Sequence, residues 1–221
     1  MILVFVSDKG GVGKTTTVIN TAVYLMRKNV NVIIVKADRN NDLFAWRDLR
    51  NDAGFKSIPI YEAYGDISTS LNKLKKLCDV LLVDCAGHDS SEFRSSLTIA
   101  DTVITTVKPS SMLERNTLTA VTEKIRKAQS KHGNPNMQAY VLMTRVSSRK
   151  LSSAVALDNE LRSDEIWLQP LKTRISEFDV FENAINAGVG VHEVEKASSL
   201  NSAKAQIELF AHEIGLLKQL N

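Results

Sequence analysis

The sequence predicts an α/β fold in which helices cover both faces of a mostly parallel, twisted sheet. Short apolar runs alternate along the 221 residues with amphipathic stretches of helical period. A glycine-rich loop at residues 10–13 joins the first apolar run to the first amphipathic stretch. Hydrophobic residues make up 43% of the chain, which is enough for a buried core. No linker divides residues 1–221, so we expect one domain.

The first half of the chain is expected to hold four strands and three helices. Uninterrupted apolar runs predict buried strands at residues 2–6, 32–35 and 80–83. A fourth strand at 57–60 contains Pro59, which lacks an amide donor and therefore predicts an edge position. The first helix repeats Val18, Thr21, Ala22 and Leu25 at helical spacing. Helices are expected at residues 14–27, 42–49 and 67–77.

The second half continues the alternation. Apolar runs predict strands at residues 102–107 and 139–143, with a long helix between them, and a short strand at 166–168. A final helix is expected over 203–220, with Ile207, Phe210, Ile214 and Leu217 facing the core. This arrangement is the one expected of repeated strand–helix–strand units.

The glycine loop has the chemistry of a phosphate site. Gly10, Gly11 and Gly13 let the backbone turn and direct successive N–H groups inward, and the helix that follows adds its own N-terminal amides. Lys14 would reach the β- and γ-phosphates, and the Thr15 hydroxyl would bind Mg²⁺. The loop departs from the strict G-x-x-x-x-G-K-[ST] pattern, because position 8 is aspartate.

The stretch from Lys9 to Thr16, with Val12 between its glycines, resembles the deviant Walker A motif of the ParA/MinD superfamily. The resemblance implies a P-loop NTPase fold and a homodimer with nucleotide sandwiched between the subunits. Lys14 would act on its own subunit's nucleotide and Lys9 on that of the partner. The loop begins at residue 7, which leaves no room for a helix-turn-helix before it and favours the small, ParF-like plasmid partition proteins.

Two aspartates follow predicted strands and complete the expected site. Asp84 ends the run at 80–83 and occupies the place of a Walker B carboxylate, which would hold Mg²⁺. Gly87 resembles the glycine of the switch loop that follows it. Asp38 follows the run at 32–35 and matches the second acid of the family's D-x-D-P-Q segment, which orients the attacking water. Each aspartate taken alone also fits an ordinary turn.

The surroundings of Asp38 depart from the family pattern. Lys36 replaces the first aspartate, and Arg39 and Asn40 replace the Pro-Gln pair. A lysine at this position would either lower the pKa of Asp38 or pair with another acid nearby. The hydrolytic half of the expected site is therefore less well defined than the binding half.

The nucleotide expected from the sequence is ATP, because the guanine-reading N-K-x-D pattern is absent. Arg145 follows the strand at 139–143, where relatives contact the base, and we carry over an adenine contact; a solvated loop arginine fits as well. The segment after residue 107, with Pro109, resembles one that borders the family's dimer face. Residues 175–193 resemble a late helix-and-loop segment in which Phe178 replaces a frequent arginine.

Composition narrows the class of protein. The net charge of +3 permits nucleic-acid binding without requiring it. Cys78 and Cys85 match no metal pattern, and no apolar run is long enough to span a membrane. The N-terminus has no signal-peptide pattern, so we expect a cytoplasmic protein without a membrane partner. Association with the nucleoid is implied by the resemblance to the ParA/MinD superfamily.

The resemblance implies a slow DNA-partition ATPase whose ATP-bound dimer binds nonspecific DNA and which a centromere-binding protein of the ParB/ParG kind stimulates. Each basic residue alone also fits a solvated helix face. The candidate DNA contacts are Lys124, Arg126, Lys127, Lys131, Arg145, Arg149, Lys150, Lys172 and Arg174.

Three other functions remain open. A MinD-like membrane-surface ATPase would need an amphipathic, basic terminal helix, whereas the expected last helix carries Glu208 and Glu213. A metal-cluster reductase or metallochaperone would need more cysteines at closer spacing. A scaffold that does not hydrolyse ATP would not need Asp38, although Lys36 leaves this alternative open.

Overall fold

The computed structural model describes residues 1–7, 9–85, 90–109, 112–130 and 133–217, with the side chains of 112–117 excepted. Within these residues seven strands form one sheet in the order β3-β2-β4-β1-β5-β6-β7, and every pair is parallel. The strands are β1 Ile2–Val6, β2 Val32–Ala37, β3 Ile60–Glu62, β4 Val80–Cys85, β5 Thr102–Val107, β6 Gln138–Val146 and β7 Gln169–Ser176. The predicted α/β fold class is confirmed.

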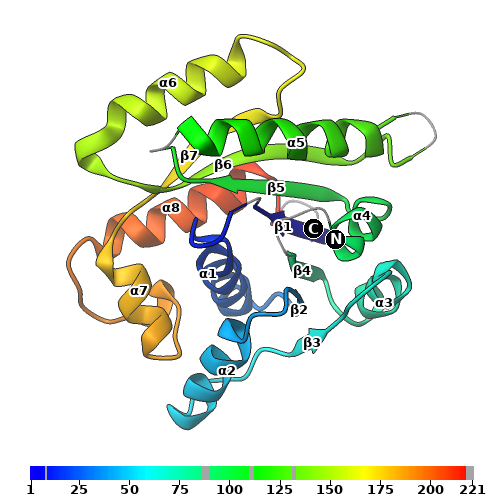
Figure 1. Cartoon of the computed structure of the whole chain (residues 1–221). Helices are drawn as coiled ribbons and strands as arrows, with labels where there is room; N and C mark the ends of the chain where they lie inside the picture. The colour runs from blue at the N-terminus through cyan, green and yellow to red at the C-terminus, as the bar shows by residue number, and fades with distance from the viewer. Residues whose placement is uncertain (8, 86–89, 110–111, 131–132, 218–221) are drawn as a thin grey trace.

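Helices cover both faces of the sheet (Figure 1). One face packs against α1 Lys14–Arg27, α2 Asp42–Asp52, α7 Asp179–Asn186 and α8 Leu200–Glu213. The other packs against α3 Ser68–Leu74, α4 Ser91–Leu97, α5 Met112–Ala128 and α6 Leu151–Arg162. Leu3 and Phe5 of β1 face the first layer, while Val4 faces the second. This alternation with both faces buried explains why the central strands are apolar throughout.

Several strands and helices begin or end at residues other than the predicted ones. The strand expected at 57–60 is β3 at Ile60–Glu62, and its edge position is confirmed. The helix expected at 67–77 divides into α3 and the 3₁₀ turn Lys75–Leu77. The last helix is α8, which begins before residue 203 and ends at Glu213. Of the predicted core residues, Ile207 and Phe210 of α8 and Ile214 after it are buried, and Leu217 is half-buried against them; residues 218–220 lie outside the described chain.

One predicted strand is wrong. Residues 166–168 form a turn, and the strand of this region is β7, which starts at Gln169. Arg126 stabilises the turn by donating hydrogen bonds to the carbonyls of Glu165, Ile166 and Trp167. Ile166 is 70% exposed, so the apolar pair at 166–167 does not mark a buried strand.

A buried polar cluster joins α2 to the segment after α7. The Arg50 guanidinium pairs with the Glu193 carboxylate at 2.7 Å, and both side chains are almost fully buried. Arg50 also donates to the Gly188 carbonyl, and Trp46 donates to the Val189 carbonyl. Gly188 has φ +71°, and a Cβ there would lie 2.4 Å from the Arg50 backbone nitrogen, so this approach requires glycine.

Among the described residues, no helix combines the length and the apolar character that crossing a membrane requires.

Candidate functional site

The glycine loop lies between β1 and α1, in the middle of the sheet's carboxyl edge, because β4 and β5 flank β1. Gly11 and Gly13 have φ values of +76° and +91°, which residues with a Cβ rarely adopt. The Thr144 side chain donates a hydrogen bond to the Val12 carbonyl and supports the loop from β6. The loop residues and the first residues of α1 line one cavity, which is the placement that a phosphate site requires.

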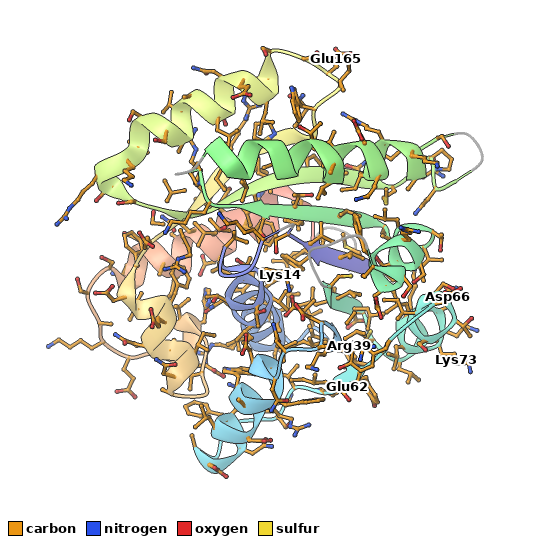
Figure 2. The ribbon with its side chains drawn as sticks, in the orientation of Figure 1. Lys14, Arg39, Glu62, Asp66, Lys73 and Glu165 are labelled. Carbon is orange, nitrogen blue, oxygen red and sulfur yellow. The ribbon has the colours of Figure 1, made fainter. Side chains whose placement is uncertain are left out.

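Lys14, the first residue of α1, is held between two carboxylates (Figure 2 labels Lys14). Its Nζ forms an ion pair with Asp84 and lies 3.6 Å from Asp38 Oδ2. Asp84 is fully buried in β4 beside Phe5 of β1, and its second oxygen accepts a 2.7 Å hydrogen bond from Thr15 Oγ1. The structure therefore brings together the lysine, hydroxyl and two acids that the sequence analysis placed in one site.

Lys36 does not contact Asp38 in this arrangement. Its buried Nζ donates to Glu62 at 2.9 Å and to Tyr64 at 2.8 Å, so the lysine pairs with another acid, as one of the two alternatives required. Burial lowers the pKa of Lys36, but the hydrogen bonds to Tyr64 and Glu62 outweigh burial and raise it above its ordinary value. Asp38 instead accepts a hydrogen bond from the Asn40 amide.

Arg145 contacts the glycine loop itself. Its guanidinium donates to the Gly11 carbonyl at 2.9 Å and to Glu177 Oε1 at 3.2 Å. Lys108 Nζ donates to the same Glu177 oxygen at 3.0 Å. The predicted adenine contact of Arg145 stays a prediction, although the residue lines the cavity described below. The sequence analysis missed Glu177 and Lys108, because a lone acid and a lone lysine in loops carry no pattern.

These residues surround a cavity of about 600 Å³ at the carboxyl edge of the sheet. The glycine loop, Lys9 and Asp38 line one part of it, and apolar side chains of the β7–α7 region and α8 line another. The apolar part is suited to a planar base, and the polar part to phosphates. The lining includes Lys9, Gly10, Gly11, Val12, Gly13, Lys14, Thr15, Thr16, Asp38, Arg145, Glu177, Phe178, Phe181, Ile185 and Ile207.

Three positions of the sequence analysis, Asp8, Gly87 and Lys131, lie outside the described residues. Cys85 follows Asp84 and is buried; this burial raises the pKa of its thiol to about 12, so the thiolate is strongly disfavoured. Cys85 and Cys78 are both free cysteines.

The candidate DNA contacts fall into two groups. Arg126, Arg145 and Arg174 have protein partners: carbonyls for Arg126, Gly11 and Glu177 for Arg145, and Asp158 at 3.5 Å for Arg174. Lys124 is half-buried and has a contact of its own. Arg145 is exposed, as are Lys127, Arg149, Lys150 and Lys172. Arg149 and Lys150 follow β6, at the same edge of the sheet as the glycine loop.

A glycine loop with a buried lysine, a hydroxyl and strand-end carboxylates at the centre of a parallel sheet defines a P-loop nucleotide-binding ATPase. Residues 3–182 match the family model described as the CobQ/CobB/MinD/ParA nucleotide binding domain, so the chain belongs to this family. The match covers the loop, both aspartates, Arg145 and Glu177.

Individual relatives share the whole fold. Maintenance of carboxysome distribution protein A from Gloeobacter kilaueensis is 25% identical over 213 residues, which are 96% of this chain and 93% of the relative. The structure of apo McdA from Cyanothece superposes with a TM-score of 0.75 at 16% identity, over 97% of this chain and 99% of that one. Cobyrinic acid a,c-diamide synthase from Mycobacterium smegmatis, solved with an ATP analogue and magnesium, gives 0.71 at 19% identity, over 96% and 94%.

Proposed function

We propose that this protein is a ParA/MinD-type positioning ATPase that dimerises around ATP and binds nonspecific DNA in that state. The observation that carries this proposal is the placement of two lysines of one loop. Lys14 is buried at the base of the cavity, whereas Lys9 is exposed and also lines it. A lysine at the opening is placed to reach the nucleotide of a second subunit across a shared face.

The residues at the closed end of the cavity fit MgATP. The loop amides and Lys14 supply donors and positive charge for the phosphates. Thr15 and Asp84 offer a hydroxyl and a carboxylate oxygen 2.7 Å apart, which are hard donors of the kind that Mg²⁺ selects. Mg²⁺ bound there would neutralise charge on the phosphates. Lys14 would leave Asp84 for the phosphates, and the apolar side chains of α7 and α8 would contact the base.

Hydrolysis is assigned to Asp38. Its carboxylate is partly exposed to the cavity and lies 3.6 Å from Lys14, so it can accept a hydrogen bond from a water molecule near the terminal phosphate. Phosphoryl transfer needs a positioned water and neutralised charge more than covalent chemistry. We expect slow turnover by the protein alone and faster turnover with a small partner protein of the ParB/ParG kind.

The DNA surface is assigned to Arg149 and Lys150. Both residues are exposed, and both lie at the edge of the sheet that carries the glycine loop. A dimer formed across this edge would join two such basic groups into one surface, which strengthens phosphate binding without sequence preference.

The cargo is proposed to be a DNA molecule, which the protein would segregate while it is bound to the DNA of the nucleoid. A protein body is the second candidate, because the curated relative is named for carboxysome distribution. A MinD-like membrane role is less well supported. Ile207 and Phe210 of α8 are fully buried, so these apolar residues have no surface to offer to lipid.

The test is co-sedimentation and gel shift of nonspecific duplex DNA with ATP, ADP or no nucleotide. We expect the protein to bind DNA with ATP but not with ADP or without nucleotide. In a plot of the logarithm of the binding constant against the logarithm of the salt concentration, the magnitude of the slope should decrease by about one in each of the Arg149→Ala and Lys150→Ala variants. Anionic vesicles form the parallel arm. DNA binding that ignores the nucleotide would overturn the switch, and ATP-dependent binding to vesicles without DNA binding would favour the membrane alternative.

A further inference from the structure

A cluster of charged residues, Lys108, Glu177 and Arg145, lies against the glycine loop. Three strands supply it: Lys108 follows β5, Arg145 lies in β6, and Glu177 follows β7. Glu177 Oε1 accepts from Lys108 Nζ at 3.0 Å and from Arg145 Nε at 3.2 Å, and Arg145 Nη2 lies 3.1 Å from it. The remaining guanidinium nitrogen donates to the Gly11 carbonyl at 2.9 Å.

The backbone of Arg145 adds a second, independent observation. Its φ is +50°, in the left-handed region that residues with a Cβ seldom adopt. Such a conformation persists only where the surroundings hold it, and it is concentrated at functional sites. Here it accompanies two contacts with the loop: Arg145 Cγ lies within van der Waals contact of Gly13, 3.5 Å from where a Cβ would stand, and the Thr144 hydroxyl donates to the Val12 carbonyl. The end of β6 is therefore shaped to fit the glycine loop.

We propose that Glu177 is a positioning residue for nucleotide binding: it holds the Arg145 guanidinium on the Gly11 carbonyl and so fixes the top of the glycine loop. Without the carboxylate, Arg145 can turn away into solvent and the loop loses a support next to Lys9. This role deepens the proposed function, because a fixed loop would serve both ATP binding in one subunit and the presentation of Lys9 to the other.

An ordinary surface ion pair is the competing explanation. The Arg145 and Glu177 side chains are 45% and 37% exposed, and isolated pairs at such exposure contribute little to stability. This pair differs from an isolated one because Arg145 also donates to the Gly11 carbonyl of the glycine loop. The pair is therefore expected to have little influence on folding and a measurable influence on nucleotide affinity, which separates the two explanations.

The first experiment measures the ATP and ADP dissociation constants of Glu177→Gln by calorimetry. We expect binding about two- to fivefold weaker than in the unmodified protein, with an unchanged thermal midpoint. Glu165→Gln is the matched control, because it removes the same charge from a turn far from Lys14 (Figure 2). Equal affinities for Glu177→Gln and the unmodified protein would overturn the proposal, as would a loss of affinity that only tracks a fall in the thermal midpoint.

A double-mutant cycle tests whether Glu177 acts through Arg145. In the Arg145→Ala background, Glu177→Gln should have no further effect on ATP affinity, because the group it positions is gone. Additive effects would show that Glu177 acts independently of Arg145 and would overturn the positioning role. If the unmodified protein binds no ATP, the proposed function itself fails; if it binds ATP and the cycle shows no coupling, only this inference fails.

Discussion

The Lys14 ammonium and the Asp84 carboxylate form a buried ion pair at the junction of β1, β4 and α1. The lysine expected to contact phosphate is thus held by the carboxylate expected to hold Mg²⁺. Each of these groups compensates the charge of the other in a place where an isolated charge would be costly. Under the proposed function, binding of MgATP would replace this pair by two new ones, Lys14 with phosphate and Asp84 with the metal ion.

Replacing Lys14 by methionine should abolish ATP binding and also destabilise the protein. The substitution leaves Asp84 fully buried without its cation, for which we expect a loss of about 3 kcal/mol in the free energy of unfolding. Urea denaturation measures the loss, and calorimetry measures the binding. The double variant Lys14→Met/Asp84→Asn is the control: it should recover most of the stability but no ATP binding. A double variant as unstable as the single one would contradict this account.

Lys9→Ala should separate nucleotide binding from dimerisation. Lys9 is exposed at the opening of the cavity, so the variant should fold normally and still bind ATP as a monomer. Loss of a charge buried against the partner's phosphates should weaken the ATP-dependent dimer by about 2 kcal/mol or more. Analytical ultracentrifugation with ATP measures the change. Normal dimerisation of this variant would show that Lys9 does not act across the dimer.

Asp38→Ala should keep ATP binding and lose turnover by about 100-fold, the scale expected when a group that positions or activates water is removed. Single-turnover phosphate release measures the rate, and calorimetry confirms binding. Lys36→Met is the comparison. Its Nζ bonds Glu62 and Tyr64 rather than Asp38, so this variant should retain most of the turnover. Unchanged turnover in Asp38→Ala would remove the water-positioning role.

His192 predicts a stability change on acidification. Burial lowers the pKa of His192 below its ordinary value, although Glu208 at 3.1 Å opposes this effect. The unfolded chain therefore takes up a proton first as the pH falls through about 6.5, and stability declines from there to the lower pKa of the folded state. Between pH 7.5 and pH 5.5, the midpoint of urea unfolding should decrease less in His192→Gln than in the unmodified protein. An equal fall would assign the acid sensitivity to other groups.

The parts of the fold predicted from the sequence are those coded by local pattern. The strand at Thr102–Val107 was predicted at its observed bounds, and the apolar runs located β1, β2 and β4. β7 was missed because Gln169–Ser176 contains Pro170 and several polar residues, so it does not read as a buried run. The helices α4 and α6 were also not predicted: α4 has only seven residues, whereas α6 buries Ala154, Leu157 and Leu161 at helical spacing and could have been found from that pattern.

In the site, the same limit separates what was predicted from what was missed. Motif spacing brought Lys14, Thr15, Asp38 and Asp84 together, and their contacts agree with that grouping. The partner of Lys36 was left open because Glu62 lies 26 residues away, on a strand whose register no local pattern defines. Lys108 and Glu177 likewise meet Arg145 only because β5, β6 and β7 are neighbours in the sheet.

The buried Arg50–Glu193 cluster has a consequence for how the molecule moves. Segment 188–193 follows α7, is bonded to Arg50 and Trp46 of α2, and donates from Val191 to the buried Asn20 of α1. Separating any of these elements would leave a buried polar group without its hydrogen-bond partner or expose it to solvent. Buried hydrogen bonds therefore tie segment 188–193, α1 and α2 to one another, so a displacement of one of them that keeps these bonds would have to carry the other two with it.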